Sequence, residues 1–270
     1  MPPLTFALNH MTAPALSLDA FFSLATSLGI AHVEIRNDLA GNAILDGTTP
    51  ETVKDLAARH GVSILSINAL QRFNEWTEAR AVEAKDLIDY AAACGAKALV
   101  LVPKNDGTGQ ADGERQANLR QALSALKPML DAAGIIGLVE PLGFEICSLR
   151  SKREAADAIA AVEGLDTFRL VHDTFHHHLA GEPDLFGDLT GLVHISGVDD
   201  ATVGVPDMRD PHRVLVGDGD RLDNAGQIRA LRTAGYAGPL SFEPFAPVVH
   251  TLSDPKTAVS DSMAYIAEHL

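Results

Sequence analysis

The chain has 270 residues, of which 46% are hydrophobic and 21% charged, and its 36 acidic and 21 basic residues give a net charge of −15. This composition excludes intrinsic disorder, and no apolar run reaches the roughly 18 residues that a membrane span needs. The excess of negative charge argues against nucleic acid as a partner, because such binders neutralise phosphates with a basic surface. We therefore expect a globular protein that binds a small neutral or cationic molecule, without a nucleic-acid or membrane partner.

Two features of the sequence predict a cytoplasmic protein. The N-terminal segment has neither a basic start nor a cleavable apolar stretch, so we expect no secretory signal. Cys94 and Cys147 are too few for a disulfide framework, and alone they do not make a zinc site. The sequence leaves the formation of a homo-oligomer open.

The first half of the chain alternates short apolar runs, typical of strands, with longer helical patterns. We predict strands at residues 4–9, 32–36, 63–68 and 98–103. Helices are predicted between and after them at residues 17–28, 49–60, 78–94 and 112–133. Capping residues such as Ser17 and Thr49 precede the helices, and a glycine follows each helix end.

The second half repeats this alternation. Strands are predicted at residues 135–140, 168–173, 192–196 and 239–243. Helices are predicted at residues 151–162, 224–234 and 254–270, whereas the pattern over 177–189 is too short and broken to predict one. The longest irregular stretch, 197–223, follows the seventh strand, where a barrel places an active-site loop.

Eight strand–helix units in one chain of this length predict a single α/β domain over residues 1–270, folded as a (β/α)₈ TIM barrel. The strands are continuous apolar runs, as in a parallel sheet that is buried on both faces. A doubly wound open sheet is the structural alternative.

Four successive predicted strands carry an ionisable residue at or near their carboxyl ends: Glu140, Asp173, His194 and Glu243. A single acidic residue there is often a helix cap or a salt-bridge partner. Four on adjacent strands indicate a common site, because a buried carboxylate must be paired, protonated or bound to a metal. Oxygen and imidazole ligands suit Mn²⁺, Zn²⁺, Co²⁺ or Mg²⁺, so we predict one divalent ion whose charge removes most of the repulsion among the carboxylates.

Three histidines follow the sixth strand directly. We expect His176 to contact substrate if a turn brings it next to Asp173. His177 and His178 are expected to be structural or to face solvent. His172 points away from Asp173 in a regular strand, so we interpret it as a packing residue.

Two other residues at the predicted barrel mouth have alternative roles. Lys104, at the end of the fourth strand, either polarises a substrate hydroxyl or is a surface residue. Trp76, in the segment after the third strand, either packs on a polyol ring or has a purely structural packing role.

The sequence resembles the xylose isomerase-like barrel superfamily and, within it, the 2-keto-myo-inositol (inosose) isomerase family. The resemblance runs through nearly the whole chain. It rests on residues 6–9, 32–36, 67–70, 73–74, 170–176, 194, 199–200, 213–214, 217–219 and 241–245. One departure is His172, where the family more usually has an apolar residue.

This resemblance implies a metal-dependent isomerase that moves a carbonyl to the adjacent carbon by proton transfer through an enediolate. It implies that the metal ligands are Glu140, Asp173, His194 and Glu243. It also implies that Glu140 and Glu243 move the proton and that His176 and Arg213 contact substrate oxygens. The segment around Asn68, a further candidate substrate contact, favours the inosose enzyme and hence a cyclic polyol substrate.

Other functions fit the same residues. A ketose 3-epimerase or a hydroxypyruvate-type isomerase would use the same metal site. An AP-endonuclease-like hydrolase shares the barrel and the ligands, but it uses several metal ions and additional histidines, and the acidic charge of this chain counts against it. A non-catalytic sugar-binding protein could also retain the metal.

Overall fold

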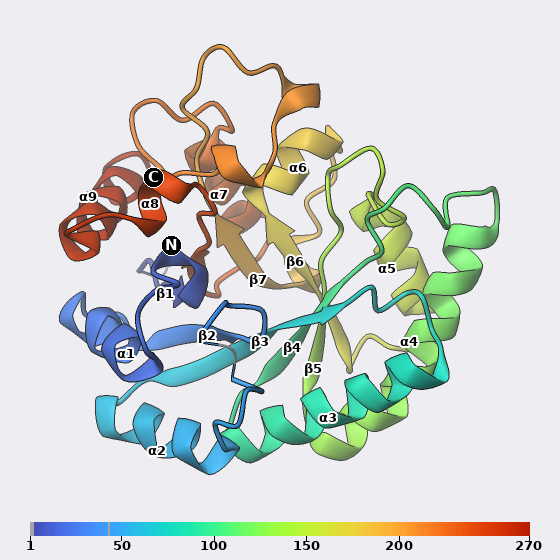
Figure 1. Ribbon diagram of the computed structural model, residues 1–270. Coiled ribbons are helices and arrows are strands. Elements are labelled where there is room, and N and C mark those ends of the chain that lie inside the picture. Colours follow the sequence, from blue (N-terminus) through green and yellow to red (C-terminus); the bar gives the residue numbers. More distant parts are fainter. Residues whose placement is uncertain (1–2, 43) are drawn as a thin grey trace.

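A computed structural model describes residues 3–42 and 44–270 and shows a closed barrel of eight strands (Figure 1). Part of the N-terminal segment from which we expect no secretory signal lies outside the described residues. The strands are β1 (Phe6–Asn9), β2 (His32–Arg36), β3 (Ser63–Gln71), β4 (Ala98–Val102), β5 (Ile136–Val139), β6 (Phe168–Asp173), β7 (Thr190–Ile195) and β8 (Leu240–Phe242). Each strand pairs in parallel with the next, and β8 pairs with β1. The predicted TIM barrel is therefore confirmed, and the open sheet is excluded.

The helices surround the barrel (Figure 1). They are α1 (Leu18–Ser27), α2 (Pro50–His60), α3 (Glu78–Cys94), α4 (Glu114–Ala133), α5 (Lys152–Ala161), α6 (Thr174–Ala180), α7 (Asn224–Thr233), α8 (Pro247–His250) and α9 (Pro255–Glu268). The hydroxyls of Ser17, Thr49 and Ser151 accept hydrogen bonds from the first turns of α1, α2 and α5. Local capping thus fixes where the chain leaves the loop and enters each of these helices.

The alternation of side chains along the strands separates two apolar layers. Leu99 and Leu101 of β4 belong to the main core between the barrel and its helices, whereas Val100 belongs to a smaller cluster. That smaller cluster also holds Val171 and Leu192, which lie two positions before Asp173 and His194 and hence on the same, inner faces of β6 and β7. An apolar layer therefore fills the barrel directly below the predicted metal ligands.

The segment after β6 differs from the sequence prediction. No helix was predicted in this part of the chain, but α6 begins at Thr174, immediately after the strand. Asp173 caps it, since Asp173 Oδ1 accepts hydrogen bonds from the backbone N–H groups of Phe175 (2.8 Å) and His176 (3.0 Å). The carboxylate therefore provides the start signal that the short apolar pattern does not reveal, and it supplies the turn that His176 requires.

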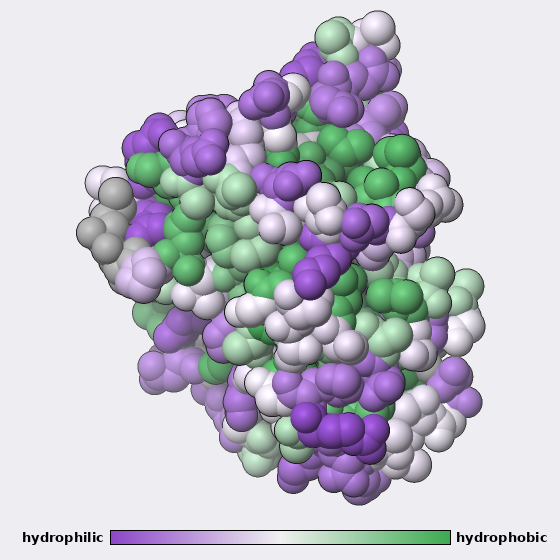
Figure 2. Space-filling view, turned by 90° about the vertical axis from the view of Figure 1, so that its left-hand side faces the viewer, coloured by the Kyte–Doolittle hydropathy of each residue, from purple (hydrophilic) through white to green (hydrophobic). Residues whose placement is uncertain are grey.

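The surface shown in Figure 2 mixes apolar and hydrophilic side chains. Val248 in α8 is 64% exposed and Leu252 just after it 37% exposed, which makes them two of the large apolar side chains at the surface. Both cysteines are buried and free. Within the described residues, no helix combines the length and apolar character needed to cross a membrane.

Candidate metal centre and substrate cavity

The structure brings the four predicted ligands together at the carboxyl ends of β5 to β8. Glu140 follows β5, Asp173 ends β6, His194 lies in β7 and Glu243 follows β8. One potential ligand atom from each lies within 4.8 Å of the others, and all four residues are buried. The parallel register explains the convergence, because Asp173 is paired with His194 across the β6–β7 ladder.

The imidazole of His194 lies at the centre of this group. Its Nδ1 is 2.9 Å from Glu140 Oε1, 3.2 Å from Glu243 Oε2 and 4.0 Å from Asp173 Oδ2. Burial alone would lower the pKa of His194, but the carboxylates of Glu243, Glu34 and Glu140 raise it well above its usual value. The site therefore stabilises a positive charge between the carboxylates of Glu140, Glu243 and Asp173, which all face His194 Nδ1.

The two glutamates of the group differ in their environments. Burial raises the pKa of Glu140. Burial would also raise the pKa of Glu243, but His194, Arg213 and Arg36 together hold it well below its usual range. Glu243 is thus kept ionised by three cationic groups, whereas Glu140 is the carboxylate of the pair that more readily holds a proton.

Glu34, on β2, is a buried site residue that the sequence analysis did not identify. Its Oε2 accepts hydrogen bonds from Ser66 Oγ (2.5 Å) and Asn68 Nδ2 (2.9 Å), and its Oε1 accepts one from Ser241. His194 Nε2 lies 3.2 Å from the same Oε2. Because an ionised carboxylate only accepts hydrogen bonds, a proton on Nε2 satisfies this contact, and Nδ1, which faces the other carboxylates, is the nitrogen that would bind a metal in place of its proton.

Two buried arginines also contact the group. Arg213 Nη2 lies 2.6 Å from Asp173 Oδ2 and 3.0 Å from Glu243 Oε2, and Arg36 Nη1 lies 2.8 Å from Glu243 Oε1. Four buried carboxylates, with Glu34 included, thus face two guanidinium groups. With His194 neutral as a metal ligand, one divalent cation would neutralise the remaining two negative charges, and the oxygen and imidazole donors suit such an ion.

A cavity of about 350 Å³ opens onto the candidate metal centre. Its lining includes both glutamates, Glu140 and Glu243, and three of the predicted substrate contacts, Asn68, His176 and Arg213. His176 is buried, and its Nδ1 has no hydrogen-bond partner among the described residues. This nitrogen therefore has hydrogen-bonding capacity that the described residues do not use.

The structure places Lys104 and Trp76 elsewhere. Both line a neighbouring pocket of about 180 Å³, and Lys104 pairs there with Glu75. Its backbone N–H also donates to Asn74 Oδ1 (2.8 Å). Neither side chain belongs to the lining of the cavity above the metal centre.

The remaining histidines near β6 lie behind the strand. His172 points out of the barrel, as the alternation of the strand predicts, and its Nδ1 is 2.9 Å from Lys152 Nζ. The same Nζ lies 2.9 Å from His177 Nδ1, and His172 Nε2 lies 2.8 Å from Gln227 Oε1. His172 is thus a buried residue of a polar cluster, and His177 is structural.

The fold and the polar group define a TIM barrel with a candidate metal centre at the carboxyl ends of its strands. The chain belongs to the xylose isomerase-like TIM barrel family, whose model matches residues 22–269. The resemblance to the xylose isomerase-like barrel superfamily is therefore confirmed.

Three solved structures illustrate how widely this fold is shared. A xylose isomerase domain-containing protein from Salmonella typhimurium LT2 is 34% identical, with 97% of each chain covered and a TM-score of 0.90. The IolI protein, solved with a bound zinc atom, is 21% identical, with 99% of each chain covered and a TM-score of 0.87. An L-ribulose 3-epimerase is 19% identical over 99% of this chain and 95% of its own, with a TM-score of 0.73. No curated protein sequence matches the chain.

Proposed function

We propose that the protein is a divalent-metal-dependent isomerase of sugars or cyclic polyols, with 2-keto-myo-inositol as the substrate that the sequence favours. The observation that carries this proposal is the position of Glu140 and Glu243, which line one cavity and lie 2.9 Å and 3.2 Å from His194 Nδ1. The zinc atom bound to the similar IolI fold and the resemblance around Asn68 support the metal and the substrate.

The proposed chemistry is a proton transfer between neighbouring carbons. A bound divalent ion would supply Lewis acidity toward the carbonyl and the adjacent hydroxyl of the substrate. One glutamate removes the proton from the carbon that bears the hydroxyl, and the other returns a proton to the former carbonyl carbon. The hydroxyl proton moves to the former carbonyl oxygen, so the substrate and product are isomers. Arg213, beside Glu243, keeps that carboxylate ionised, and His176 offers Nδ1 to a substrate oxygen.

The charge of the cavity favours a neutral substrate over a hydroxypyruvate-type acid. Each arginine that lines the cavity already pairs with a carboxylate: Arg36 with Asp38 (2.8 Å), Arg72 with Glu75 (2.8 Å) and Arg213 with Asp173 (2.6 Å). A substrate carboxylate would have to displace one of these partners, whereas hydroxyl groups do not. The same acidic surroundings disfavour a nucleic-acid substrate.

Epimerisation of an open-chain ketose is the second candidate, because two glutamates that face one substrate can remove and return a proton at the same carbon. The fold shared with an L-ribulose 3-epimerase is compatible with it. The position of the label after reaction in heavy water separates the two reactions.

The test is incubation of the metal-loaded protein with 2-keto-myo-inositol and a panel of ketoses in D₂O, with products identified by NMR. Isomerisation moves the carbonyl and leaves deuterium at the former carbonyl carbon, whereas epimerisation inverts a labelled carbon beside an unmoved carbonyl. Complete transfer without exchange would favour a hydride shift. Exhaustive chelation should abolish turnover and a divalent ion should restore it. Turnover by protein shown to be metal-free would contradict the proposal.

A further inference from the structure

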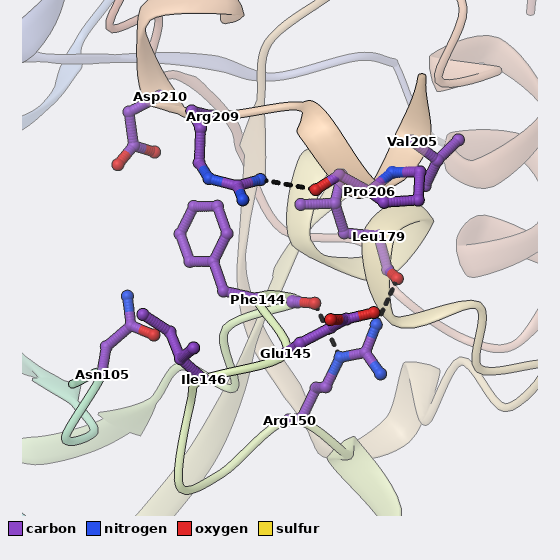
Figure 3. A pocket seen from close by; sticks show the side chains of 11 residues that line it. Asn105, Phe144, Glu145, Ile146, Arg150, Leu179, Val205, Pro206, Arg209 and Asp210 are labelled. Atoms are coloured by element: carbon purple, nitrogen blue, oxygen red, sulfur yellow. Dashed lines mark hydrogen bonds between the residues drawn. The ribbon is translucent and has the colours of Figure 1, made fainter. Parts of the chain in front are cut away.

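A second cavity, of about 290 Å³, shares lining residues with the cavity above the metal centre, and Figure 3 shows its lining. We call it the outer cavity. It is formed by the segment 143–150 after β5, by Leu179 of α6 and by residues 205–210 after β7. Both cavities are lined by Asn105, Phe144 and Asp210, so the two spaces are neighbours that share one wall. The outer cavity is therefore the neighbouring space toward which a group attached to a substrate in the inner cavity would extend.

The outer cavity has a mixed lining. Its apolar side consists of Phe144, Ile146, Leu179, Val205 and Pro206 (Figure 3). Ile146 is 52% exposed and Val205 is 38% exposed, so both present apolar surface to whatever fills the space.

Polar groups of the outer cavity complement this apolar side. Asn105 Oδ1 is buried and has no hydrogen-bond partner among the described residues. The carboxylates of Glu145 and Asp210 also belong to the lining. A sugar ring has the matching chemistry, because its C–H face is apolar and its edge carries hydroxyls that donate to such oxygens.

Internal hydrogen bonds hold the outer cavity in shape. Arg150 donates to the carbonyl oxygens of Gly143 and Leu179, both at 2.7 Å (Figure 3). Arg209 donates to Pro206 O (2.8 Å), and its guanidinium lies 5.8 Å from the centroid of the Phe144 ring. The bond to Leu179 joins the segment after β5 to α6, and the contact of Arg209 with Phe144 joins it to the segment after β7. The other two bonds stiffen single segments, so the space exists before a ligand arrives.

Phe144 links this wall to the proposed substrate contact. Its ring lies edge-on to His176, with the ring centroids 5.1 Å apart. A Cβ added at Gly143 would lie 2.3 Å from His176 O, so this close approach requires a glycine. A group in the outer cavity would consequently lie next to the side chain expected to bind the substrate in the inner cavity.

We propose that the outer cavity is a subsite for a hexosyl group linked to the ring or chain that is isomerised. The substrate class would then be glycosylated ketoses or glycosylated cyclic polyols rather than free sugars. The two cavities have similar volumes, so each offers space for one ring. This inference rests on the proposed function and specifies its substrate.

The test compares each parent sugar with its glycosylated form on the metal-loaded protein. D-Fructose is compared with turanose, maltulose and isomaltulose, which carry glucose at three different positions of fructose. In calorimetric binding, myo-inositol is compared with galactinol, its galactoside. We expect kcat/KM of at least one disaccharide to exceed that of fructose, and galactinol to bind more tightly than myo-inositol, each by about tenfold.

The variant Val205→Trp fills the outer cavity. The kcat/KM and affinity of each glycosylated compound, divided by those of its parent, should then fall to near one. Val82→Trp is the matched control, since Val82 lies on α3, is 63% exposed and is not part of either cavity. It should leave the ratio as in the wild type. 6-O-Benzyl fructose tests whether any apolar group at this position raises kcat/KM. We expect its increase over fructose to be smaller than that of isomaltulose.

Three results would overturn the subsite: no glycosylated compound exceeds its parent, Val205→Trp leaves the ratio unchanged, or the benzyl ether gains as much as the hexosyl group. A changed oligomeric state of Val205→Trp in light scattering, with an unchanged ratio, would instead assign the cavity to a second copy of the chain. If galactinol binds more tightly than myo-inositol but no compound is isomerised or epimerised, the proposed function fails while the subsite stands.

Discussion

Two buried polar clusters lie on opposite sides of β6, and consecutive residues of that strand belong to each. The inner cluster, inside the barrel, comprises Glu34, Glu140, Asp173, His194 and Glu243. The outer cluster, between the barrel wall and the helices, comprises Lys152, His172, His177 and Gln227. Because side chains alternate along a strand, Asp173 faces inward and His172 outward.

The two central histidines have opposite electrostatic environments although both are buried. Burial and the nearby Lys152 lower the pKa of His172 well below its usual value. His194 is surrounded by carboxylates, which outweigh burial and raise its pKa. The inner cluster therefore has an excess of negative charge that a cation would balance, whereas the outer cluster already contains its cation. We expect changes to the inner cluster to affect metal binding and activity, and changes to the outer cluster to affect stability.

The largest expected effect is that of Glu140→Gln. We expect kcat to fall by about 10²- to 10⁴-fold, the usual contribution of a general acid or base. The free energy of unfolding should not decrease, because the change removes a negative charge from a crowded group. Steady-state kinetics and urea unfolding measure the two effects. Glu268→Gln, at an exposed position at the end of α9, is the control. A loss of affinity with kcat retained would indicate a binding protein instead of an enzyme.

The second prediction concerns the pH dependence of stability that Lys152 causes. Burial lowers the pKa of Lys152 from 10.5 to about 8. Between these values the unfolded chain binds more protons than the folded protein, so the free energy of unfolding rises with pH. The shift in pKa corresponds to an increase of about 3 kcal/mol in the free energy of unfolding by pH 10.5.

Lys152→Met should remove this gain. We would measure the free energy of unfolding in urea for the wild type and the variant at pH 7 and near pH 10.5. The difference between the two proteins is then compared at the two pH values. Lys54→Met, at an exposed position of α2, is the control and should leave the pH dependence unchanged. A difference between wild type and Lys152→Met that stays constant with pH would mean that Lys152 is not the group responsible.

The third prediction tests whether Glu34 orients His194 for the metal. Glu34→Gln replaces the charged acceptor at Nε2 with a neutral one, and we expect the metal dissociation constant to increase by about 10- to 100-fold. Calorimetric titration with Zn²⁺ measures the affinity, and ¹⁵N chemical shifts report the tautomer of His194. Glu51→Gln, exposed on α2, is the control. Unchanged affinity together with an unchanged tautomer would remove Glu34 from the site.

The difference between Glu34 and the predicted ligands shows what a sequence can reveal. Glu140, Asp173 and Glu243 stand where apolar runs end, and the barrel rule assigns such positions to the site. Glu34 lies within a strand, between Val33 and Ile35, where local pattern does not distinguish a site residue from any other polar side chain. Its partners become visible only when the barrel closes.

Long-range contacts explain the other gaps in the prediction. The hydrogen bond from Ser241 to Glu34 joins residues 207 positions apart in sequence. Arg36 reaches Glu243 across the same closure of the barrel. The eight-unit alternation predicts the order of the strands, but the capping of α6 by Asp173 and the pairing of Lys104 with Glu75 depend on how side chains are oriented at strand ends.

The smallest expected effect is that of His172→Leu, which introduces the kind of residue more usual in the inosose isomerase family. Lys152 loses one of its two imidazole partners, so we expect stability to fall by about 1 kcal/mol. Metal affinity should change less than twofold, because the His172 side chain lies outside the barrel. Urea unfolding and Zn²⁺ titration measure these effects.

A double variant sharpens the comparison of the two clusters. Adding Lys152→Met to His172→Leu removes the buried charge that the single change leaves with fewer partners, so the double variant should be more stable than the sum of the two single changes predicts. Leu at position 172 then lies beside the Met side chain instead of a buried ammonium group. If His172→Leu weakened Zn²⁺ binding as strongly as Glu34→Gln does, the two clusters would be coupled through β6, and the separation of binding from stability would be wrong.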